Sequence, residues 1–331
     1  MWHKIIIPKA ELQLKATLKA GQTFHWIETG EQEWTSSFHG NLLSLKQEDD
    51  GISFSAHSKG SLTNLDLVTE QLKDYFQLDL LCLEENYKRW SDADPHFKTK
   101  AIKIPGVRIL RQDPLENIVS FICSSNNNIS RISQMVQNLC KTYGACVGSY
   151  KSQKFYSFPA LEDLAKDGVE AKLRELGFGY RAKYISQSSR QILSLGGKEW
   201  LNSLRKAPFL EARQAIQKLS GVGPKVADCV CLMSLDKSEA IPVDTHVFQI
   251  AVRDYKIFEE QGRYPQVLKE ISNVKKKLKI SEEKDSSTIK LPKTLTPAIY
   301  LKISVGFRQL FGAHAGWAHS VLFAADLPDF K

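Results

Sequence analysis

A glycine-containing turn between two predicted helices carries the residues best suited to chemistry. Residues 219–229 read Leu-Ser-Gly-Val-Gly-Pro-Lys-Val-Ala-Asp-Cys. We expect one helix to end near Leu219, Gly221 and Gly223 to form a hairpin, and Pro224 to begin the next helix. Glycine lets a backbone approach a ligand closely, and free N–H groups at a helix start bind anions such as phosphate. The alternative is a plain helix–turn–helix connection that needs glycine only for its turn.

Lys225 lies in the first turn of the second helix, where lysine is unusual. The positive end of the helix dipole disfavours a cation there. This placement predicts a lowered pKa and an amine that is free to act as a nucleophile. The alternative is an exposed lysine that contacts phosphate.

A carboxylate follows at the start of another predicted helix. Asp244 lies nineteen residues after Lys225, in the segment Ile-Pro-Val-Asp-Thr-His of residues 241–246. It is suited to cap that helix, which is a common role for aspartate. It is equally suited to point a negative charge at the mouth of the hairpin site, and one side chain can do both.

These residues lie in a part of the chain that predicts helices throughout. From residue 105 onward, Asp113-Pro114 is a capped helix start that leads through Ile122. The further predicted helices cover residues 129–143, 170–176, 181–195, 209–219, 224–235, 245–255, 297–311 and 316–325. Residues 259–295 are polar and lysine-rich, and we interpret them as a surface insertion.

The first 104 residues predict a separate antiparallel β-sheet with a covering helix. Short β-rich runs occur at residues 24–27, 42–45 and 52–55, with turns at residues 29–31 and 49–51. Residues 65–76 place Leu65, Val68, Leu72 and Phe76 on one helical face. The expected fold class is therefore α+β, with a sheet domain at 1–104 and a helical domain at 105–331.

Composition excludes several protein classes and favours an anionic partner. No apolar run approaches the roughly 20 residues of a membrane span, and residues 1–8 resemble neither a signal nor a transit peptide. The six cysteines form no C-x-x-C pair, which argues against a zinc ribbon and suits buried thiols in a reducing compartment. Residues 1–104 hold 12 basic and 15 acidic residues, whereas residues 105–331 hold 33 and 22. The whole positive excess lies in the helical part, as expected for contact with a polyanion.

The hairpin and the Pro-Val-Asp segment resemble the signature of helix-hairpin-helix (HhH-GPD) DNA glycosylases with a catalytic lysine. Within that superfamily the chain resembles the eukaryotic 8-oxoguanine DNA glycosylase family. The resemblance rests on residues 21–26, 121–129, 176–184, 225–229 and 315–318, in this order along the chain. It implies a TBP-like (TATA-binding-protein-like) sheet domain followed by an all-α glycosylase domain.

The family resemblance implies a bifunctional glycosylase and lyase of base excision repair. Such an enzyme flips out 8-oxoguanine opposite cytosine, and formamidopyrimidine-guanine as a further substrate, excises the base and nicks the strand by β-elimination. By similarity, Lys225 attacks the anomeric carbon and forms a Schiff base. By similarity, Asp244 stabilises the positive charge that develops on the sugar.

The resemblance also implies a pocket for the extruded base. Gly21 would offer its carbonyl to the N–H that distinguishes the oxidised base, and Cys229 and Phe323 would pack on its two faces. Ordinary core packing is the alternative for Cys229 and Phe323. On the opposite strand, Asn126 would fill the gap, Arg131 and Arg181 would read the cytosine, and Tyr180 would wedge the stack. Turn and cap roles are the alternative for the asparagine run 126–128.

The resemblance implies that Gly221, Gly223 and His246 contact the DNA backbone. A surface or capping role is the alternative for His246. One position departs from the family: His319 stands where the family has a glutamine that reads the guanine Watson–Crick edge. Histidine offers only part of that hydrogen-bonding pattern, which predicts weaker or more pH-dependent discrimination at this edge.

The resemblance also sets expectations for cofactors, partners and location. No cysteine follows Cys231, so the chain lacks the four-cysteine iron–sulfur motif of some relatives. We expect no required cofactor and no catalytic metal, with calcium or a monovalent ion at the hairpin carbonyls as an option. The expected partner is double-stranded DNA with oxidised guanine, bound by a monomer that works beside downstream repair proteins. The nucleus is the expected location and the mitochondrion the alternative.

Two other functions remain open at this point. One is a helix-hairpin-helix glycosylase for a different damaged base. The other is a non-catalytic DNA-binding module that uses the hairpin only for phosphates and needs neither Lys225 nor Asp244.

Overall fold

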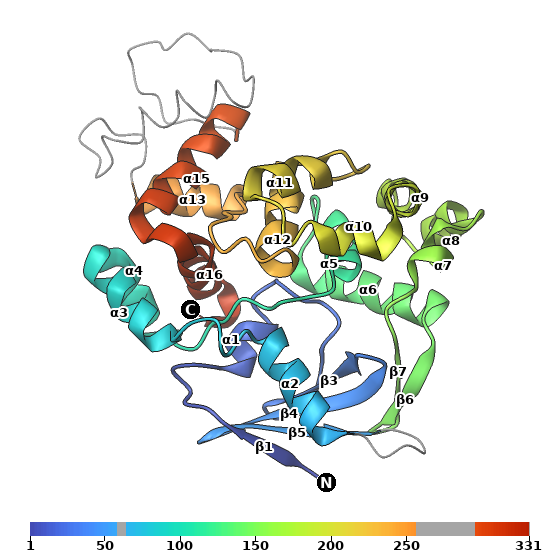
Figure 1. Ribbon diagram of the computed structural model, residues 1–331, viewed down its shortest axis with the longest axis horizontal. Helices are drawn as coiled ribbons and strands as arrows, with labels where there is room; N and C mark the ends of the chain where they lie inside the picture. The colour runs from blue at the N-terminus through green and yellow to red at the C-terminus, as the bar shows by residue number, and fades with distance from the viewer. Residues whose placement is uncertain (58–63, 256–294, 331) are drawn as a thin grey trace.

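The computed structural model describes residues 1–57, 64–255 and 295–330. An antiparallel sheet lies at one end of the molecule and a helical bundle at the other (Figure 1). The sheet has the strand order β1-β5-β4-β3-β2. Its strands are β1 (His3–Ile6), β2 (Ile27–Gly30), β3 (Glu33–Phe38), β4 (Asn41–Glu48) and β5 (Gly51–Ala56).

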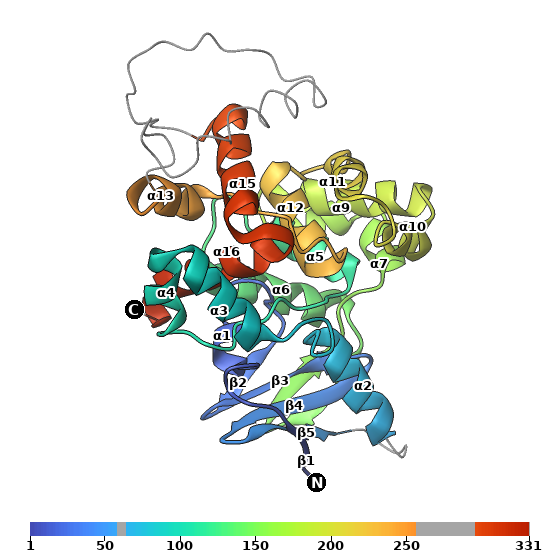
Figure 2. The ribbon, with the colours of Figure 1, turned by 60° about the vertical axis from the view of Figure 1, so that its left-hand side comes forward.

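Helix α2 (Leu65–Tyr75) covers one face of this sheet (Figure 2). Its first turn is capped by Asn64, whose side chain accepts from the backbone N–H of Leu67. Val68 and Leu72 on the helix are buried in the same cluster as apolar side chains of the strands. The predicted sheet with a covering helix is therefore confirmed.

The first predicted strand was placed too early along the chain. Strand β2 begins at Ile27, so Phe24 lies outside the sheet, buried in the cluster of the helical part. Thr29 and Gly30, which the sequence assigned to a turn, belong to β2, where the pairing with β3 shifts register. Strand β1 was not predicted, because its pairing with β5 joins segments almost fifty residues apart.

The helices after residue 105 confirm the predicted helical part, but three further helices lie within residues 1–104 and were not predicted. The helices before the hairpin are α1 (Leu14–Leu18), α3 (Leu83–Ala93), α4 (Pro95–Ala101), α5 (Pro114–Ile122), α6 (Ile129–Tyr143), α7 (Leu161–Ala165), α8 (Val169–Glu175), α9 (Arg181–Ser194) and α10 (Gly197–Ser203). The remaining ones are α11 (Phe209–Gln217), α12 (Pro224–Ser234), α13 (Thr245–Arg253), α15 (Pro297–Phe311) and α16 (Ala315–Asp326), with short 3-10 turns at Gly312–His314 and Pro328–Phe330. The predicted insertion at 259–295 lies, except for Leu295, outside the described residues.

The two parts of the chain are connected by elements that cross between them. A hairpin of β6 (Cys146–Tyr150) and β7 (Gln153–Tyr156), absent from the sequence prediction, extends from α6 toward the sheet. There the Tyr150 ring stacks on His57 with centroids 4.4 Å apart. In the other direction, α3 and α4 pack against α15 and α16, and Trp90 Nε1 donates to the Phe311 carbonyl at 3.2 Å.

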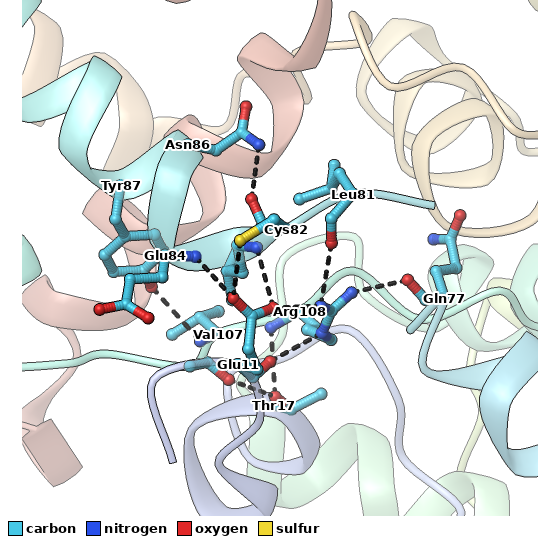
Figure 3. A network of polar contacts seen from close by, with 12 residues as sticks. Glu11, Thr17, Gln77, Leu81, Cys82, Glu84, Asn86, Tyr87, Val107 and Arg108 are labelled. Atoms are coloured by element: carbon cyan, nitrogen blue, oxygen red, sulfur yellow. Dashed lines mark hydrogen bonds and ion pairs between the residues drawn. The ribbon is translucent and has the colours of Figure 1, made fainter. Parts of the chain in front are cut away.

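A buried ion pair between Glu11 and Arg108 connects the N-terminal segment to the chain that leads into the helical part (Figure 3). Arg108 is 1% exposed, and its Nη2 lies 2.6 Å from Glu11 Oε2. The Glu11 carboxylate also accepts the N–H groups of Leu83 and Glu84, each at 2.8 Å, at the start of α3. Burial opposes ionisation of Glu11, but these two N–H groups and Arg108 hold its pKa below its ordinary value.

We expect Glu11→Gln to destabilise the fold by about 3 kcal/mol, because it leaves the Arg108 guanidinium buried without a counter-charge. A depressed carboxylate pKa contributes stability that is present above the ordinary value of 4.5 and lost as pH falls through the folded value. Denaturant titrations at pH 7 and in acid should therefore show a difference between wild type and variant that shrinks in acid. The matched control is Glu28→Gln at the exposed pair with Lys19, expected to cost less than about 1 kcal/mol. Equal losses in the two variants would contradict this role of Glu11.

Candidate active site

The hairpin between α11 and α12 has the predicted form, but its two glycines have different surroundings. Gly221 has φ +79°, and a Cβ at this position would lie 2.5 Å from the Cβ of Tyr184 on α9. Gly223 is exposed with an ordinary extended backbone, and a Cβ there would meet nothing within 4 Å. The fold thus explains glycine at 221, whereas nothing within the described protein requires glycine at 223.

Lys225 is the second residue of α12 and is half-buried. Its Nζ lies 3.2 Å from Ser124 Oγ and 4.7 Å from the centroid of the Phe121 ring. No carboxylate forms an ion pair with Lys225 among the described residues. The amine is therefore held in place by a hydroxyl and an aromatic face, without a counter-ion that would tie up its charge.

Asp244 caps α13, as the sequence predicted for its structural role. Its Oδ1 accepts from the Val247 N–H at 2.9 Å. The preceding loop is held by Tyr300 on α15, whose hydroxyl accepts from the Val243 N–H at 3.2 Å.

Tyr300 in turn belongs to a buried cluster that joins α11, α12 and α15. Its hydroxyl contacts the carboxylate of Asp228, which pairs with Arg213 Nε at 2.6 Å. Burial and the neighbouring Asp228 carboxylate raise the pKa of Tyr300 well above its ordinary value, so the hydroxyl keeps its proton. The cluster fixes the loop before Asp244 relative to the helix that carries Lys225.

The structure brings six of the predicted site residues together around one narrow pocket of about 40 Å³. They come from four separate parts of the chain: the loop before β2, helix α12, the start of α13, and α16. The six are Gly21, Lys225, Cys229, Asp244, His319 and Phe323.

The walls of this pocket are chemically simple. Gly21 has φ +76°, and a Cβ there would lie 3.1 Å from Ile129 Cδ1 and 3.7 Å from the Phe323 ring. Cys229 is buried, and burial raises the pKa of its thiol to about 12, so the thiol is neutral at physiological pH. The pocket thus offers a bare backbone, a neutral sulfur and an aromatic edge, surfaces suited to a flat ring.

His319 is the polar group inside this pocket that lacks a hydrogen-bond partner. It is 5% exposed, and neither ring nitrogen has a partner among the described residues. Burial lowers its pKa to about 4, although Asp244 opposes the shift. The imidazole is therefore neutral near pH 7 and has one donor and one acceptor to offer.

Three other predicted residues meet beside the turn at 125–126. The Arg181 guanidinium donates to the carbonyls of Ser125 and Asn126 and lies over the Tyr180 ring at 4.6 Å. Tyr180 is 47% exposed, and its hydroxyl also donates to the Ser125 carbonyl at 3.1 Å. Asn126 is exposed with φ +46°, and the third asparagine of the run, Asn128, caps α6.

The last two predicted residues lie apart from each other. Arg131 is exposed on the first turn of α6. His246 Nε2 lies 2.9 Å from Asp326 Oδ2, and its ring meets Phe323 edge-on with centroids 5.2 Å apart. His246 thus borders the pocket without lining it.

Sequence reasoning did not single out several residues that the site depends on. Phe121 lines the pocket beneath Lys225, and Ser124 holds its amine. Asp228 and Tyr300 lie 72 residues apart in the sequence, so no local pattern connects them. The signal for Phe121, Ser124 and Asp228 was their position inside the quoted motifs.

The described part of the chain contains no cluster of three His, Cys, Asp or Glu side chains suited to hold a metal ion. The ion expected at the hairpin carbonyls stays a prediction. In the same described ranges, no helix is both long enough and apolar enough to span a bilayer.

Comparison with known protein families matches both parts of the chain. The model for the 8-oxoguanine DNA glycosylase N-terminal domain matches residues 4–118, and the model for HhH-GPD superfamily base excision DNA repair proteins matches residues 119–277. The chain is 37% identical to N-glycosylase/DNA lyase OGG1 of Arabidopsis thaliana, over 100% of this chain and 81% of that protein. It is 36% identical to the N-glycosylase/DNA lyase of Saccharomyces cerevisiae, over 98% and 86%.

Solved structures show the same overall fold. The Clostridium acetobutylicum 8-oxoguanine glycosylase/lyase in its apo form is 25% identical and has a TM-score of 0.75, covering 98% of both chains. The same enzyme in complex with double-stranded DNA containing cytosine opposite 8-oxoguanine has a TM-score of 0.73, covering 98% of this chain and 96% of that one.

Proposed function

Because the chain belongs to the 8-oxoguanine DNA glycosylase family, with N-glycosylase and DNA lyase relatives that match it over its full length, we propose that it excises 8-oxoguanine opposite cytosine and then nicks the strand. Formamidopyrimidine-guanine is included as a second substrate. The observation that carries the proposal is the meeting of Lys225 and Asp244 at one pocket with Gly21, Cys229, His319 and Phe323.

The proposed chemistry begins at the Lys225 amine. In its neutral form, Nζ attacks the anomeric C1′ while the glycosidic bond breaks and its electron pair leaves with the base, which takes up a proton. One amine proton is lost to solvent and a second is transferred to O4′ as the C1′–O4′ bond of the sugar ring breaks, which gives a Schiff base between Nζ and C1′. Removal of a C2′ proton then expels the 3′ phosphate by β-elimination. The Ser124 hydroxyl and the Phe121 ring support this proposal, because they orient Nζ and are not carboxylates that would hold its proton in an ion pair.

Asp244 serves the same step by electrostatics. Its carboxylate is fixed at the start of α13 by the bond to the Val247 N–H. A fixed negative charge near the sugar stabilises the positive charge that develops as the base leaves, and it needs no rearrangement to do so.

Base recognition follows from the pocket walls. The Gly21 carbonyl would accept from the N–H that oxidation adds to the imidazole ring of guanine, while Cys229 and Phe323 would hold the two faces. The base must leave the duplex to reach them. On the opposite strand, Asn126 and Tyr180 would occupy the gap, and Arg131 and Arg181 would contact the orphaned cytosine. Arg181 must then exchange its bonds to the 125–126 carbonyls for bonds to the cytosine.

The proposal is tested by incubating the full chain with duplexes that carry one damaged base opposite cytosine. We expect release of 8-oxoguanine and strand nicking, with no release of undamaged guanine or 3-methyladenine. Excision of another lesion instead would support the alternative glycosylase function, and tight binding without any excision would support the non-catalytic DNA-binding module. The nuclear location, the mitochondrial alternative, the monomeric state and downstream partners stay predictions.

The two hairpin glycines provide a test of DNA contact. Gly223→Ala should leave thermal stability unchanged, because the added methyl group meets open space. It should weaken duplex binding, because the methyl group keeps a phosphate away from the helix N-terminus. Gly221→Ala should instead destabilise the fold through its left-handed backbone and the collision with Tyr184. Thermal melts and fluorescence anisotropy with DNA check both, and unchanged affinity of a folded Gly223→Ala variant would contradict phosphate contact at this glycine.

His319 provides a test of base discrimination. Glutamine can present a donor and an acceptor side by side, whereas the neutral imidazole presents one nitrogen at a time to a base edge. We expect His319→Gln to raise the preference for 8-oxoguanine over 8-oxoadenine by about tenfold, the value of one hydrogen bond. The pKa of His319 is lowered to about 4, so its ring does not change charge between pH 6 and pH 9. The wild-type preference for 8-oxoguanine over 8-oxoadenine should therefore stay constant over this range, apart from pH effects that His319→Gln shows as well. Excision rates on the two lesions measure it, and an unchanged ratio would remove His319 from base reading.

A further inference from the structure

The stretch 21–26 contains a buried histidine to which the proposed chemistry gives no role. His25 is 5% exposed and lies four residues after Gly21. Its Nε2 lies 3.0 Å from the carbonyl oxygen of Tyr156 on β7. Its Nδ1 lies 3.4 Å from Glu116 Oε1 on α5.

Both ring nitrogens of His25 therefore face oxygen acceptors. A neutral imidazole has only one N–H and would place a lone pair against one of the two oxygens. Only the doubly protonated ring satisfies both partners, so the geometry points to an imidazolium cation. Burial works against this charge, but Cys140 and Glu116 outweigh it and raise the pKa of His25 well above 6.5.

The backbone carbonyl of His25 is also held by hydrogen bonds. The carbonyl oxygen accepts from Gln137 Nε2 at 3.1 Å on α6 and from Ser36 Oγ at 3.3 Å on β3. One residue thus ties together the sheet, the β6–β7 hairpin and two helices of the bundle.

The loop that carries His25 and the helix that carries Glu116 both contribute residues to the base pocket. On one side, the loop that carries His25 also carries Gly21, whose backbone lines the pocket. On the other, α5 carries Glu116 at one end and Phe121, which lies beneath Lys225, near the other. The rings of Phe24 and Phe121 meet edge-on with centroids 5.6 Å apart, so the loop and the helix are in direct contact.

We propose that His25, as an imidazolium bound between Glu116 and the Tyr156 carbonyl, is a positioning residue that sets the place of the Gly21 backbone relative to Phe121 and Lys225. It does not touch the substrate. The inference rests on the proposed function, since it concerns how the same pocket holds the damaged base.

The charged groups around His25 determine how its positioning role depends on pH. Glu116 faces it from α5 and Cys140 from α6, while β3 and β7 present to it only hydroxyl and backbone groups among the described residues. A second pocket, beyond Glu116, is lined by side chains of both charge signs: His39, Asp74, Arg111, Asp113, Lys198 and Arg205. A histidine pKa raised by folding contributes stability that is fully present below the ordinary value of 6.5 and lost as pH rises through the folded value. The positioning effect should therefore fade on the alkaline side.

The experiment compares wild type with His25→Asn, which removes the cation, and His25→Arg, which makes it permanent. The matched control is His39→Asn. His39 is an exposed histidine that lines the second pocket, beyond Glu116, and not the base pocket. The readouts are the single-turnover rate of 8-oxoguanine excision opposite cytosine between pH 6 and pH 10 and the affinity for undamaged duplex. Glu116→Gln, alone and combined with His25→Asn, completes a double-mutant cycle.

We expect His25→Asn to slow excision about 10- to 100-fold, the cost of a small misplacement of reacting groups. The affinity for undamaged duplex should stay unchanged, because the hairpin is intact. His25→Arg should restore most of the rate, and wild type should fall behind it as the pH rises through the raised pKa of His25. Comparing these two proteins cancels every pH effect that they share. Glu116→Gln should slow excision similarly, with little further loss in the double variant.

Three results would overturn the inference. They are a folded His25→Asn variant with the wild-type rate, a ratio of wild type to His25→Arg that is constant from pH 6 to pH 10, and additive losses in the cycle. If His25→Asn fails to fold, the pH-dependent ratio decides alone. A wild-type protein that releases no 8-oxoguanine at any pH would contradict the proposed function instead, so the two failures are distinguishable.

Discussion

Substitution of glutamine for Lys225 is expected to slow excision and nicking of an 8-oxoguanine duplex by more than about 1000-fold, because it removes the attacking nucleophile. The glutamine amide is neutral and not nucleophilic, and its side chain is only one atom shorter than that of lysine. The fold should therefore persist, and so should binding to the duplex through the hairpin. The rates are measured under single-turnover conditions with enzyme in excess, so that product release does not limit them.

The control for this variant is Lys218→Gln. Lys218 is exposed at the end of α11, close to the hairpin in sequence, and loses the same charge when replaced. Lys218→Gln should excise at close to the wild-type rate. If both lysine variants lost activity equally, the loss would reflect weaker electrostatic attraction to DNA, and Lys225 would be a phosphate contact.

Asp244→Asn is expected to slow excision by about 100- to 1000-fold with almost no change in thermal stability. Asparagine caps a helix as well as aspartate does, and its side-chain oxygen can accept from the Val247 N–H in the same way. The substitution therefore removes the negative charge and keeps the cap. Separating the two roles matters because one side chain is proposed to carry both.

Asp113→Asn is the matched control for Asp244→Asn. Asp113 caps α5 by accepting from the N–H groups of Leu115 and Glu116, and it does not line the base pocket. The control variant should keep both its melting temperature and its excision rate. An Asp244→Asn variant that is folded and fully active would show that Asp244 is only a helix cap.

Local signals explain why much of the helical part could be predicted from the sequence. Asp113, Asn128, Asp244 and Thr296 each cap a helix by accepting from a backbone N–H two or three residues ahead. Such a contact is encoded within one turn, and each helix then continues with an apolar periodicity. The position of Lys225 in the first turn of α12 follows from the same kind of signal, the hairpin followed by proline.

Some of the missed features depend on partners far along the chain, whereas β3 and the β6–β7 hairpin, also missed, pair with strands next to them in the sequence. Strand β1 has four residues and exists because β5 pairs with it. The strand expected at 24–27 starts only at Ile27, because Phe24 is buried against Phe121 of the helical part and not in the sheet. The pairing of Glu11 with Arg108 spans 97 residues, and nothing near either residue predicts it.

The site shows the same division. Lys225, Cys229 and Asp244 could be placed near one another from the hairpin and the cap, because the three are close in sequence. Gly21, His319 and Phe323 were assigned to the same pocket by the family resemblance and by no local signal, and the structure brings them together there. The structure was needed to show that Gly221 packs against Tyr184 while Gly223 is open. The lowered pKa of His319 keeps its ring neutral near pH 7, and the ring has no hydrogen-bond partner among the described residues, which favours weaker over pH-dependent discrimination.

The most direct test of the central claim is to identify the atom that bonds to DNA. The full chain is incubated with a duplex carrying one 8-oxoguanine opposite cytosine in the presence of borohydride, which reduces a Schiff base to a stable amine. The covalent adduct is then digested with protease and nuclease, and the modified peptide is mapped by mass spectrometry. The account predicts a single adduct on Lys225 that is absent from Lys225→Gln. An adduct on another residue, or excision that proceeds with no adduct formed, would contradict it.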